Sequence, residues 1–287
     1  MENYLFNQVA SEYHSRLRFY RHKTVKVMTI ISAIVLIMSI IFWFVQKTNN
    51  ELFPLFIVFI VIFIFLALIT IMLSRTWISE KPLFEYLIPK VIEDISASGE
   101  ATITYSPYPK EREFFENVGI FHKGVTKYLR YKMEYLSQNH FSTTIYDCYA
   151  YVSNGKTTTT MLDGLYYCFE IQNPQAFQLR SWGSPALKGI KFNKVDSSDK
   201  TKVYSEISIQ KPIENKCFQI YQLMRASNPK GIQYLGGYKN QFDIAISQPK
   251  RFKRMKDLTP ENYRLLKASI LDNCIFAENV YTHLTEY

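Results

Sequence analysis

The sequence predicts an α+β protein with an N-terminal transmembrane helical hairpin and a cytosolic domain. In that domain an antiparallel or mixed β-sheet is packed by helices, including a long C-terminal helix. Three observations predict this arrangement: two long apolar segments near the N-terminus, alternating apolar residues in the middle, and an apolar helical stripe near the C-terminus. Strands and helices come in blocks, which favours α+β over a parallel doubly wound fold.

The two apolar segments cover residues 25–45 and residues 52–73. At about 1.5 Å rise per residue, each reaches about 30 Å, the thickness of the hydrocarbon core. A signal peptide does not fit the first segment, which is too long and lacks a small-residue cleavage site. A buried soluble helix does not fit either, because both segments are apolar around their whole circumference. We therefore predict transmembrane helices 1 and 2, joined by a short external loop at residues 46–51.

Positive charge marks the cytoplasmic side of this hairpin. The basic residues before the first span and after the second are Arg16, Arg18, Arg21, Lys23, Lys26, Arg75 and Lys81. The positive-inside rule predicts that both termini lie in the cytoplasm, with the protein as a multi-pass component of the cell (inner) membrane. The span interiors carry no ionisable residue, which favours an anchor over a transport pathway.

Residues 1–24 precede the first span and form a cytosolic amphipathic segment. Aromatic and apolar residues such as Tyr13, Leu17 and Tyr20 recur at steps of three and four, which indicates a helix. Its apolar stripe could lie on anionic lipid or pack on the cytosolic domain. The moderate, aromatic character of the stripe favours packing on protein.

The cytosolic domain is expected to span residues 80–287. Its first element is a helix over residues 82–95 that Pro89 kinks or restarts. An extended stretch follows and ends at Ser106–Pro109. A short helix carrying Phe114, Phe115 and Val118 then closes on Gly119, because glycine suits the left-handed position after a helix.

Several strands follow in the middle of the domain. Residues 145–152 and 157–162 form a hairpin around Asn154-Gly155, the strongest short turn signal. Alternating side chains predict three further strands, over residues 165–171, 203–209 and 242–246, the last after a turn at Gly236-Gly237.

A long helix covers this sheet. Thr259 provides its N-cap and Pro260 its first position. One apolar face is formed by Tyr263, Leu266, Ile270, Cys274, Ala277, Tyr281 and Leu284.

No catalytic, metal-binding or cofactor-binding motif is present in the sequence. Cys148, Cys168, Cys217 and Cys274 form no CxxC pair, so we expect reduced, buried thiols rather than disulfides or a metal site. A Cys–His nucleophile pair drawing on His122 or His140 near Cys148 is a weak alternative. The adjacent carboxylates Glu93 and Asp94 point in different directions on a helix.

A basic run is the most distinctive polar feature, in a chain of net charge +9. It consists of Lys250, Arg251, Lys253, Arg254 and Lys256. It could form a solvated loop, bind anionic lipid headgroups, or bind an acidic partner. We expect no nucleic-acid partner, because no reader motif accompanies the charge.

Several motifs follow one another in a recognisable order. PLFEYLIPKVIEDI follows the hairpin, and FFENVGIF, LDGLYYCFEI, CFQIY and NQFDIAI come later. In this order the chain resembles the bacterial membrane proteins grouped as the domain of unknown function DUF3137, except over residues 122–140. The resemblance implies no catalytic residues, and it implies a LemA-like membrane protein as a partner.

These features together predict a membrane-anchored, non-enzymatic cytosolic interaction or regulatory module. It would bind a protein partner and, additionally, the anionic membrane surface. The alternative is a membrane-anchored enzyme whose site is assembled only in three dimensions. A deep pocket with convergent polar side chains and perturbed acids would favour that alternative.

Overall fold

The computed structural model describes most of the chain. The described residues are 2–46, 53–76, 79–110, 118–121, 124–137, 141–181, 183–185, 187, 189–195, 202–206, 211–228, 231–247 and 257–285. The chain divides into two compact units. One comprises Met1–Leu87 with Arg254–Asn262, and the other comprises Ile88–Lys253 with Tyr263–Tyr287.

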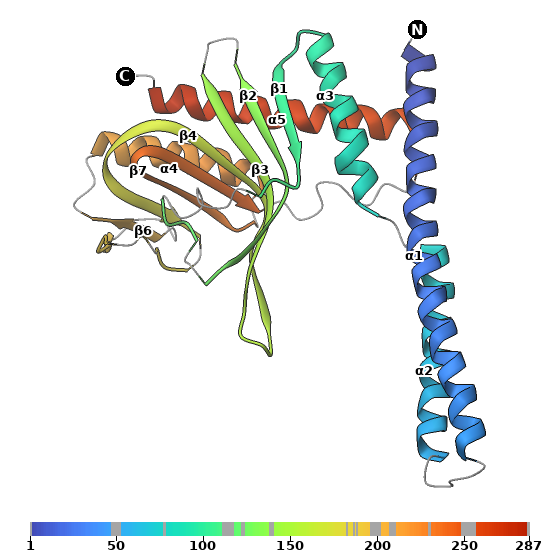
Figure 1. Cartoon of the computed structure of the whole chain (residues 1–287). Coiled ribbons are helices and arrows are strands. Elements are labelled where there is room, and N and C mark those ends of the chain that lie inside the picture. The colour runs from blue at the N-terminus through green and yellow to red at the C-terminus, as the bar shows by residue number, and fades with distance from the viewer. Residues whose placement is uncertain are drawn as a thin grey trace. The chain divides into compact units, whose positions relative to one another are not determined.

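The first unit contains the helical hairpin. Helix α1 covers Glu2–Gln46 and helix α2 covers Phe53–Thr76, and the two pack side by side (Figure 1). The rings of Phe42 and Phe59 stack between them at a centroid distance of 5.0 Å. Segments Phe6–Val45 and Phe53–Ser74 are long and apolar enough to cross a membrane. Their outer apolar side chains are exposed, as a lipid-facing surface requires.

Helix α1 continues well beyond the length of one span. Its 45 residues reach about 70 Å, so residues 2–24 and the first apolar segment form one continuous helix. The aromatic stripe in its first half contacts the π-helical turn η2, Leu83–Leu87. The Tyr20 hydroxyl donates a 2.9 Å hydrogen bond to Glu85, and the Arg16 guanidinium lies 4.6 Å from the centre of the Tyr86 ring.

The second unit is built on one seven-stranded sheet in which every pairing is antiparallel. Its strands are β1 Thr102–Pro107, β2 Thr126–Leu136, β3 Ser142–Ser153, β4 Thr158–Arg180, β5 Asn193–Val195, β6 Lys202–Ser205 and β7 Gln233–Ser247. Their order is β1-β2-β3-β4-β6-β5, with β7 also paired to β4. The long strand β4 therefore joins all other parts of the sheet, and the predicted α+β class is confirmed.

Helices α3 (Ile88–Ala97), α4 (Lys211–Ser227) and α5 (Pro260–Thr285) complete this unit. Helix α5 packs on one face of the sheet, where Phe276 contacts Tyr167 and Tyr281 stacks on Phe141 at 4.2 Å (Figure 1). Lys216 of α4 donates to the Leu284 carbonyl of α5. Lys267 of α5 pairs with Asp94 at the end of α3, so the helices hold one another as well as the sheet.

The opposite face of the sheet carries a second apolar cluster that includes Tyr166 and the loop at residues 118–121. Two buried polar side chains of β4 hold this loop. Gln178 donates a 2.6 Å hydrogen bond to the Val118 carbonyl, and Arg180 donates one of 3.0 Å to the Ile120 carbonyl. The Arg180 guanidinium also lies 4.5 Å from the centre of the Tyr234 ring, which lessens the cost of its burial.

Several predicted elements are confirmed. The hairpin turn at Asn154-Gly155 has Gly155 at φ 83°, and Gly119 has φ 71°. Thr259 caps α5 by accepting a hydrogen bond from the Asn262 backbone N–H. The helix predicted at residues 82–95 changes from π to α geometry between η2 and α3, next to Pro89. Residues Phe114 and Phe115 of the predicted short helix lie outside the described residues.

Other elements differ from prediction. The strands expected at residues 157–162 and 165–171 form the single strand β4, because Gly164 is paired on both sides, with Cys148 and Ser247. Residues 126–136, which the sequence does not place, form β2. Helix α4 was also not predicted. Of the strand expected at residues 203–209, β6 covers the first part, and residues 207–210 lie outside the described residues.

The turn expected at Gly236-Gly237 is wrong. Both glycines lie inside β7, paired with Gln178 and Phe177 of β4. A Cβ atom at Gly236 would come within 2.9 Å of the Phe177 carbonyl oxygen and 3.0 Å of a Val118 methyl group. The glycine is therefore required by close packing of the backbone rather than by a turn.

We expect Gly236→Ala to destabilise the sheet domain by about 1–3 kcal/mol, because the backbone carbonyl of Phe177 cannot move away without breaking the ladder. Thermal unfolding of the full chain in detergent, followed by circular dichroism, measures this change. Gly155→Ala is the comparison, since a Cβ at that exposed turn meets no atom and suffers only from the positive φ. Equal losses in the two variants would show that packing does not explain Gly236.

Candidate functional site

A cavity of about 670 Å³ lies on the sheet face opposite α5, where β3, β4 and β7 run side by side. It is lined by Ser142, Thr144, Tyr146, Cys168, Phe169, Glu170, Tyr238, Lys239, Asn240 and Gln241. Thr144 pairs with Cys168, and Glu170 pairs with Gln241, so the floor consists of neighbouring residues on three adjacent strands. The exposed side chains of Glu170, Lys239 and Asn240 show that the cavity opens to solvent.

A buried carboxylate lies beside this floor, on the same face of the sheet. Asp243 is fully buried and is paired across the ladder with Cys168. Its Oδ2 accepts a 2.5 Å hydrogen bond from the Tyr166 hydroxyl. Gln241 Nε2 donates to both carboxylate oxygens at 2.8 Å, and the Cys168 thiol donates to the same carboxylate. Two side chains of the cavity wall, Cys168 and Gln241, therefore connect the ligand-accessible space to Asp243.

Burial sets the protonation of this cluster. Desolvation raises the pKa of Asp243 from 3.8 to about 7, against the hydrogen bonds from Tyr166, Gln241 and Cys168, which lower it. Desolvation and the neighbouring Asp243 carboxylate also raise the pKa of the Cys168 thiol. The carboxyl group is therefore divided between its two protonation states near neutral pH, while the thiol stays protonated.

This arrangement suits binding better than nucleophilic chemistry. The thiolate is the reactive form of cysteine, and burial beside a carboxylate works against it. Asp243 could act as an acid or base near neutral pH, but it does not line the cavity and reaches it only through Cys168 and Gln241. Within the described part of the chain, no group of three or more His, Cys, Asp or Glu side chains could hold a metal ion.

The polar groups of the cavity wall are partly available to a ligand. In the described part of the chain, the side chains of Ser142, Thr144, Glu170 and Asn240 make no side-chain hydrogen bond or ion pair. The sequence offers a weak signal for this site: Gln241 and Asp243 alternate with the apolar residues Phe242 and Ile244, so they share the other face of the strand. The same alternation occurs in any strand with one face in solvent, so only the burial of Asp243 in the folded domain identifies the site.

The site residues proposed from sequence are not brought to this cavity. Lys250, Arg251, Lys253, Arg254 and Lys256 lie outside the described residues, as do His122 and His140. Glu93 pairs with Lys90 and Asp94 with Lys267, so the two carboxylates do not act together. The four cysteines are free, and Cys148, Cys217 and Cys274 are buried as predicted.

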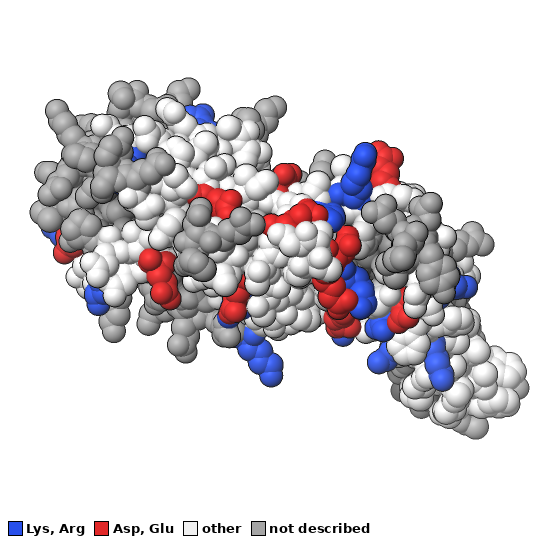
Figure 2. Space-filling model, turned by 90° about the horizontal axis from the view of Figure 1, so that it is seen from above, with Lys and Arg blue, Asp and Glu red and all other residues white. Residues whose placement is uncertain are grey.

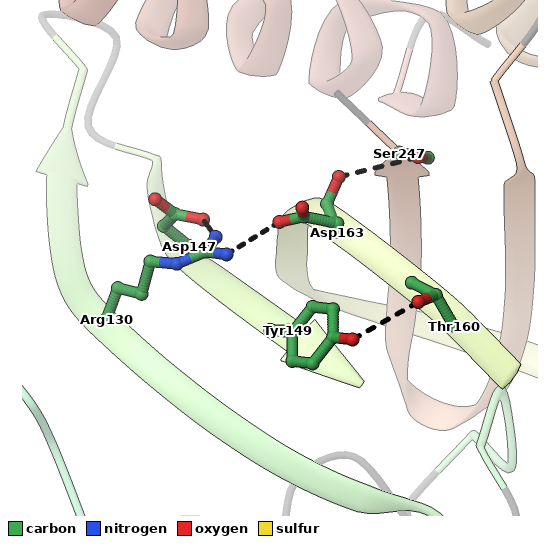
Figure 3. Close-up of polar contacts among 6 residues, drawn as sticks. All are labelled: Arg130, Asp147, Tyr149, Thr160, Asp163 and Ser247. Atoms are coloured by element: carbon green, nitrogen blue, oxygen red, sulfur yellow. Dashed lines mark hydrogen bonds and ion pairs between the residues drawn. The ribbon is translucent and has the colours of Figure 1, made fainter. Parts of the chain in front are cut away.

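Asp147 belongs to an ion-pair network on the other face of the sheet (Figure 3). Arg130, which sits at a bulge of β2, donates to Asp147 Oδ1 at 2.8 Å and to Asp163 Oδ1 at 2.7 Å. Desolvation lowers the pKa of Arg130, but Asp147 and Asp163 together outweigh it, so the pKa is raised. Tyr149 and Thr160 add a hydrogen bond between β3 and β4. The network therefore joins three strands at the bulge, and we assign it a structural role.

Charged side chains of both signs are interspersed on the face shown in Figure 2. Among the described residues of that face, no continuous basic surface is seen. The net charge of +9 is thus not displayed there as a patch that would suit nucleic acid.

The fold and the cavity define an α+β protein with a solvent-open polar site and two helices long and apolar enough to cross a membrane. No protein-family model matches the chain, and no curated protein sequence matches it. The crystal structure of the mycobacterial trehalose monomycolate transport factor A, TtfA, is a structural neighbour. It is 9% identical in sequence, with a TM-score of 0.35, and the match covers 66% of this chain and 95% of that one.

Proposed function

We propose that the protein is a membrane-anchored, non-enzymatic binding module whose α+β domain recognises a small ligand in the cavity between β3, β4 and β7. The observation that carries this proposal is the set of unengaged polar side chains around a cavity whose thiol is held protonated. The hairpin serves as the anchor, because its apolar spans carry no ionisable group in their interior.

We further propose that the domain faces the cytoplasm at the inner membrane, with both termini inside. The flanking basic residues support this orientation through the positive-inside rule. The long first half of α1 carries Arg16, Arg18, Arg21 and Lys23 just before the span, which suits the cytoplasmic leaflet. Membership of the DUF3137 group and a LemA-like membrane partner remain proposals that rest on the sequence motifs.

The orientation predicts the outcome of a protease-protection experiment on a chain with a C-terminal tag. In intact cells the tag should be protected from added protease, and in inside-out membrane vesicles it should be cleaved. A second tag placed in the loop at residues 47–50 should give the opposite pattern and serves as the control. Cleavage of the C-terminal tag from outside intact cells would overturn the cytoplasmic assignment.

A membrane-anchored enzyme is the second candidate, and one observation favours it. The pKa of Asp243 lies at about 7, which is suited to general acid–base catalysis. Asp243 does not line the cavity, and this argues for the binding role, because a general acid or base must reach the proton that it transfers. An activity that survives Asp243→Asn but is lost when the cavity is filled by Thr144→Trp would exclude Asp243 as that group.

A further inference from the structure

We propose that the cavity binds a small organic cation, with the Glu170 carboxylate as its counter-ion and the rings of Tyr146 and Tyr238 as its walls. This inference rests on the proposed function, because it names the ligand class of the same cavity. The volume of about 670 Å³ fits, since binding cavities for small molecules range from about 300 to 1,000 Å³.

The charge of the ligand is inferred from the carboxylates on this face of the sheet and from whether each already has a partner. Glu134 pairs with Lys132 at 2.8 Å, and Asp243 accepts hydrogen bonds from Tyr166, Gln241 and Cys168. Glu170 lines the cavity and makes no ion pair with a described residue. An incoming cation would therefore find an unengaged carboxylate, whereas an anion would meet a like charge.

The basic residue of the cavity does not reverse this preference. The Lys239 ammonium lies 5.1 Å from the centre of the Tyr238 ring, where its charge is already partly stabilised. Lys239 stands at φ 53° in β7, and both Lys239 and Glu170 are exposed at the cavity opening. We therefore expect Lys239 to weaken the binding of a cation without abolishing it.

The remaining groups of the wall suit an organic cation better than a metal ion. Tyr146 and Tyr238 offer aromatic surface, which attracts ammonium and guanidinium groups. Ser142, Thr144 and Asn240 supply neutral hydrogen-bonding groups. A hard metal ion would require several oxygen ligands with more than one carboxylate, and Glu170 is the cavity's one carboxylate among the described lining residues.

Three probes that share one phenol ring and differ in charge test this inference. Tyramine carries an ammonium group, tyrosol a neutral hydroxyl group, and 3-(4-hydroxyphenyl)propionate a carboxylate. Titration calorimetry on the full chain in nanodiscs at neutral pH should show tyramine binding about tenfold more tightly than tyrosol, because its hydrogen bond to Glu170 is charge-assisted. The carboxylate probe should bind most weakly.

Variants of the wall give opposite expected changes. Glu170→Gln should reduce tyramine affinity to that of tyrosol, and Lys239→Gln should raise tyramine affinity by a few fold. Glu134→Gln is the matched control, since Glu134 is on the same face of the sheet but pairs with Lys132 outside the cavity. Its tyramine affinity should equal that of the wild type.

The outcomes separate the two proposals. If tyrosol or the carboxylate probe binds at least as tightly as tyramine, and Thr144→Trp abolishes that binding, the cavity is a ligand site but the cation assignment is wrong. The same conclusion follows if Glu170→Gln leaves tyramine affinity unchanged. If none of the three probes binds, both the cation assignment and the proposed recognition role of the cavity are rejected.

Discussion

Replacing Arg130 with methionine is expected to destabilise the sheet domain by about 3–5 kcal/mol, because it removes the guanidinium that pairs with the buried Asp147 carboxylate. The Asp147 side chain is 4% exposed and depends on the 2.8 Å contact with Arg130 (Figure 3). The same guanidinium also joins Asp163 of β4 to the bulge of β2. The variant therefore removes the guanidinium that joins β2, β3 and β4.

Thermal unfolding of the full chain in detergent measures this effect. Asp163→Asn is the comparison, because the Asp163 side chain is 39% exposed and its pair with Arg130 should contribute less than about 1 kcal/mol. The double variant Arg130→Met with Asp147→Leu should recover much of the lost stability, since both charges of the pair are then removed together. A loss of less than about 1 kcal/mol for Arg130→Met would show that Asp147 is solvated or neutral in the fold.

Replacing Asp243 with asparagine is expected to remove a pH dependence of stability worth up to about 4 kcal/mol. The pKa of Asp243 is raised in the folded chain from 3.8 to about 7. Between these two values the folded state binds more protons than the unfolded state, so stability falls as pH rises. The contribution is fully present below the unfolded pKa and is lost as pH rises through about 7.

The groups around Asp243 do not obscure this signal. From β4, Tyr166 and Cys168 face the carboxylate, and burial raises the pKa of each above its ordinary value, so both stay neutral across this window. Gln241, which lies on β7 together with Asp243, has no titratable group. The ammonium of Lys132 on β2 lowers the pKa of Cys168, although burial has the larger, opposite effect. The protonation of Asp243 itself is therefore expected to account for most of the change.

Unfolding free energies measured across this pH range in detergent test the prediction. The wild type should lose stability with rising pH relative to Asp243→Asn, and the two curves should run parallel above the folded pKa. Asp94→Asn, which changes an exposed carboxylate paired with Lys267, should keep the wild-type pH dependence. Parallel curves for the wild type and Asp243→Asn over the whole range would mean that Asp243 is ionised throughout.

The protonation of Asp243 should also respond to the binding of a cation in the cavity. An ammonium group in the cavity would lie close to Cys168 and Gln241, both of which are bonded to Asp243. A nearby positive charge favours the ionised carboxylate, so cation binding should release protons near neutral pH. The cavity would then couple ligand binding to the protonation of the sheet's buried acid.

The sequence by itself determined the parts of the protein that depend on local physical rules. The two long apolar helices follow from uninterrupted apolar composition, and the hairpin turn at Asn154-Gly155 follows from backbone preference. Helix α5 follows from a helical stripe with Thr259 at its cap. In each case residues close in the chain set the structure, so a short window of sequence contains the cause.

The tertiary structure alone decided the rest. Gly236 looked like a turn residue, but the Phe177 carbonyl brought against it by β4 makes it a strand residue. Asp243 looked like an ordinary polar residue of an alternating strand. Its burial, and the meeting of Cys168, Glu170 and Gln241 in one cavity, depend on the pairing of strands distant in sequence. Desolvation is a property of the assembled surroundings, and for that reason no sequence window around Asp243 could reveal its pKa.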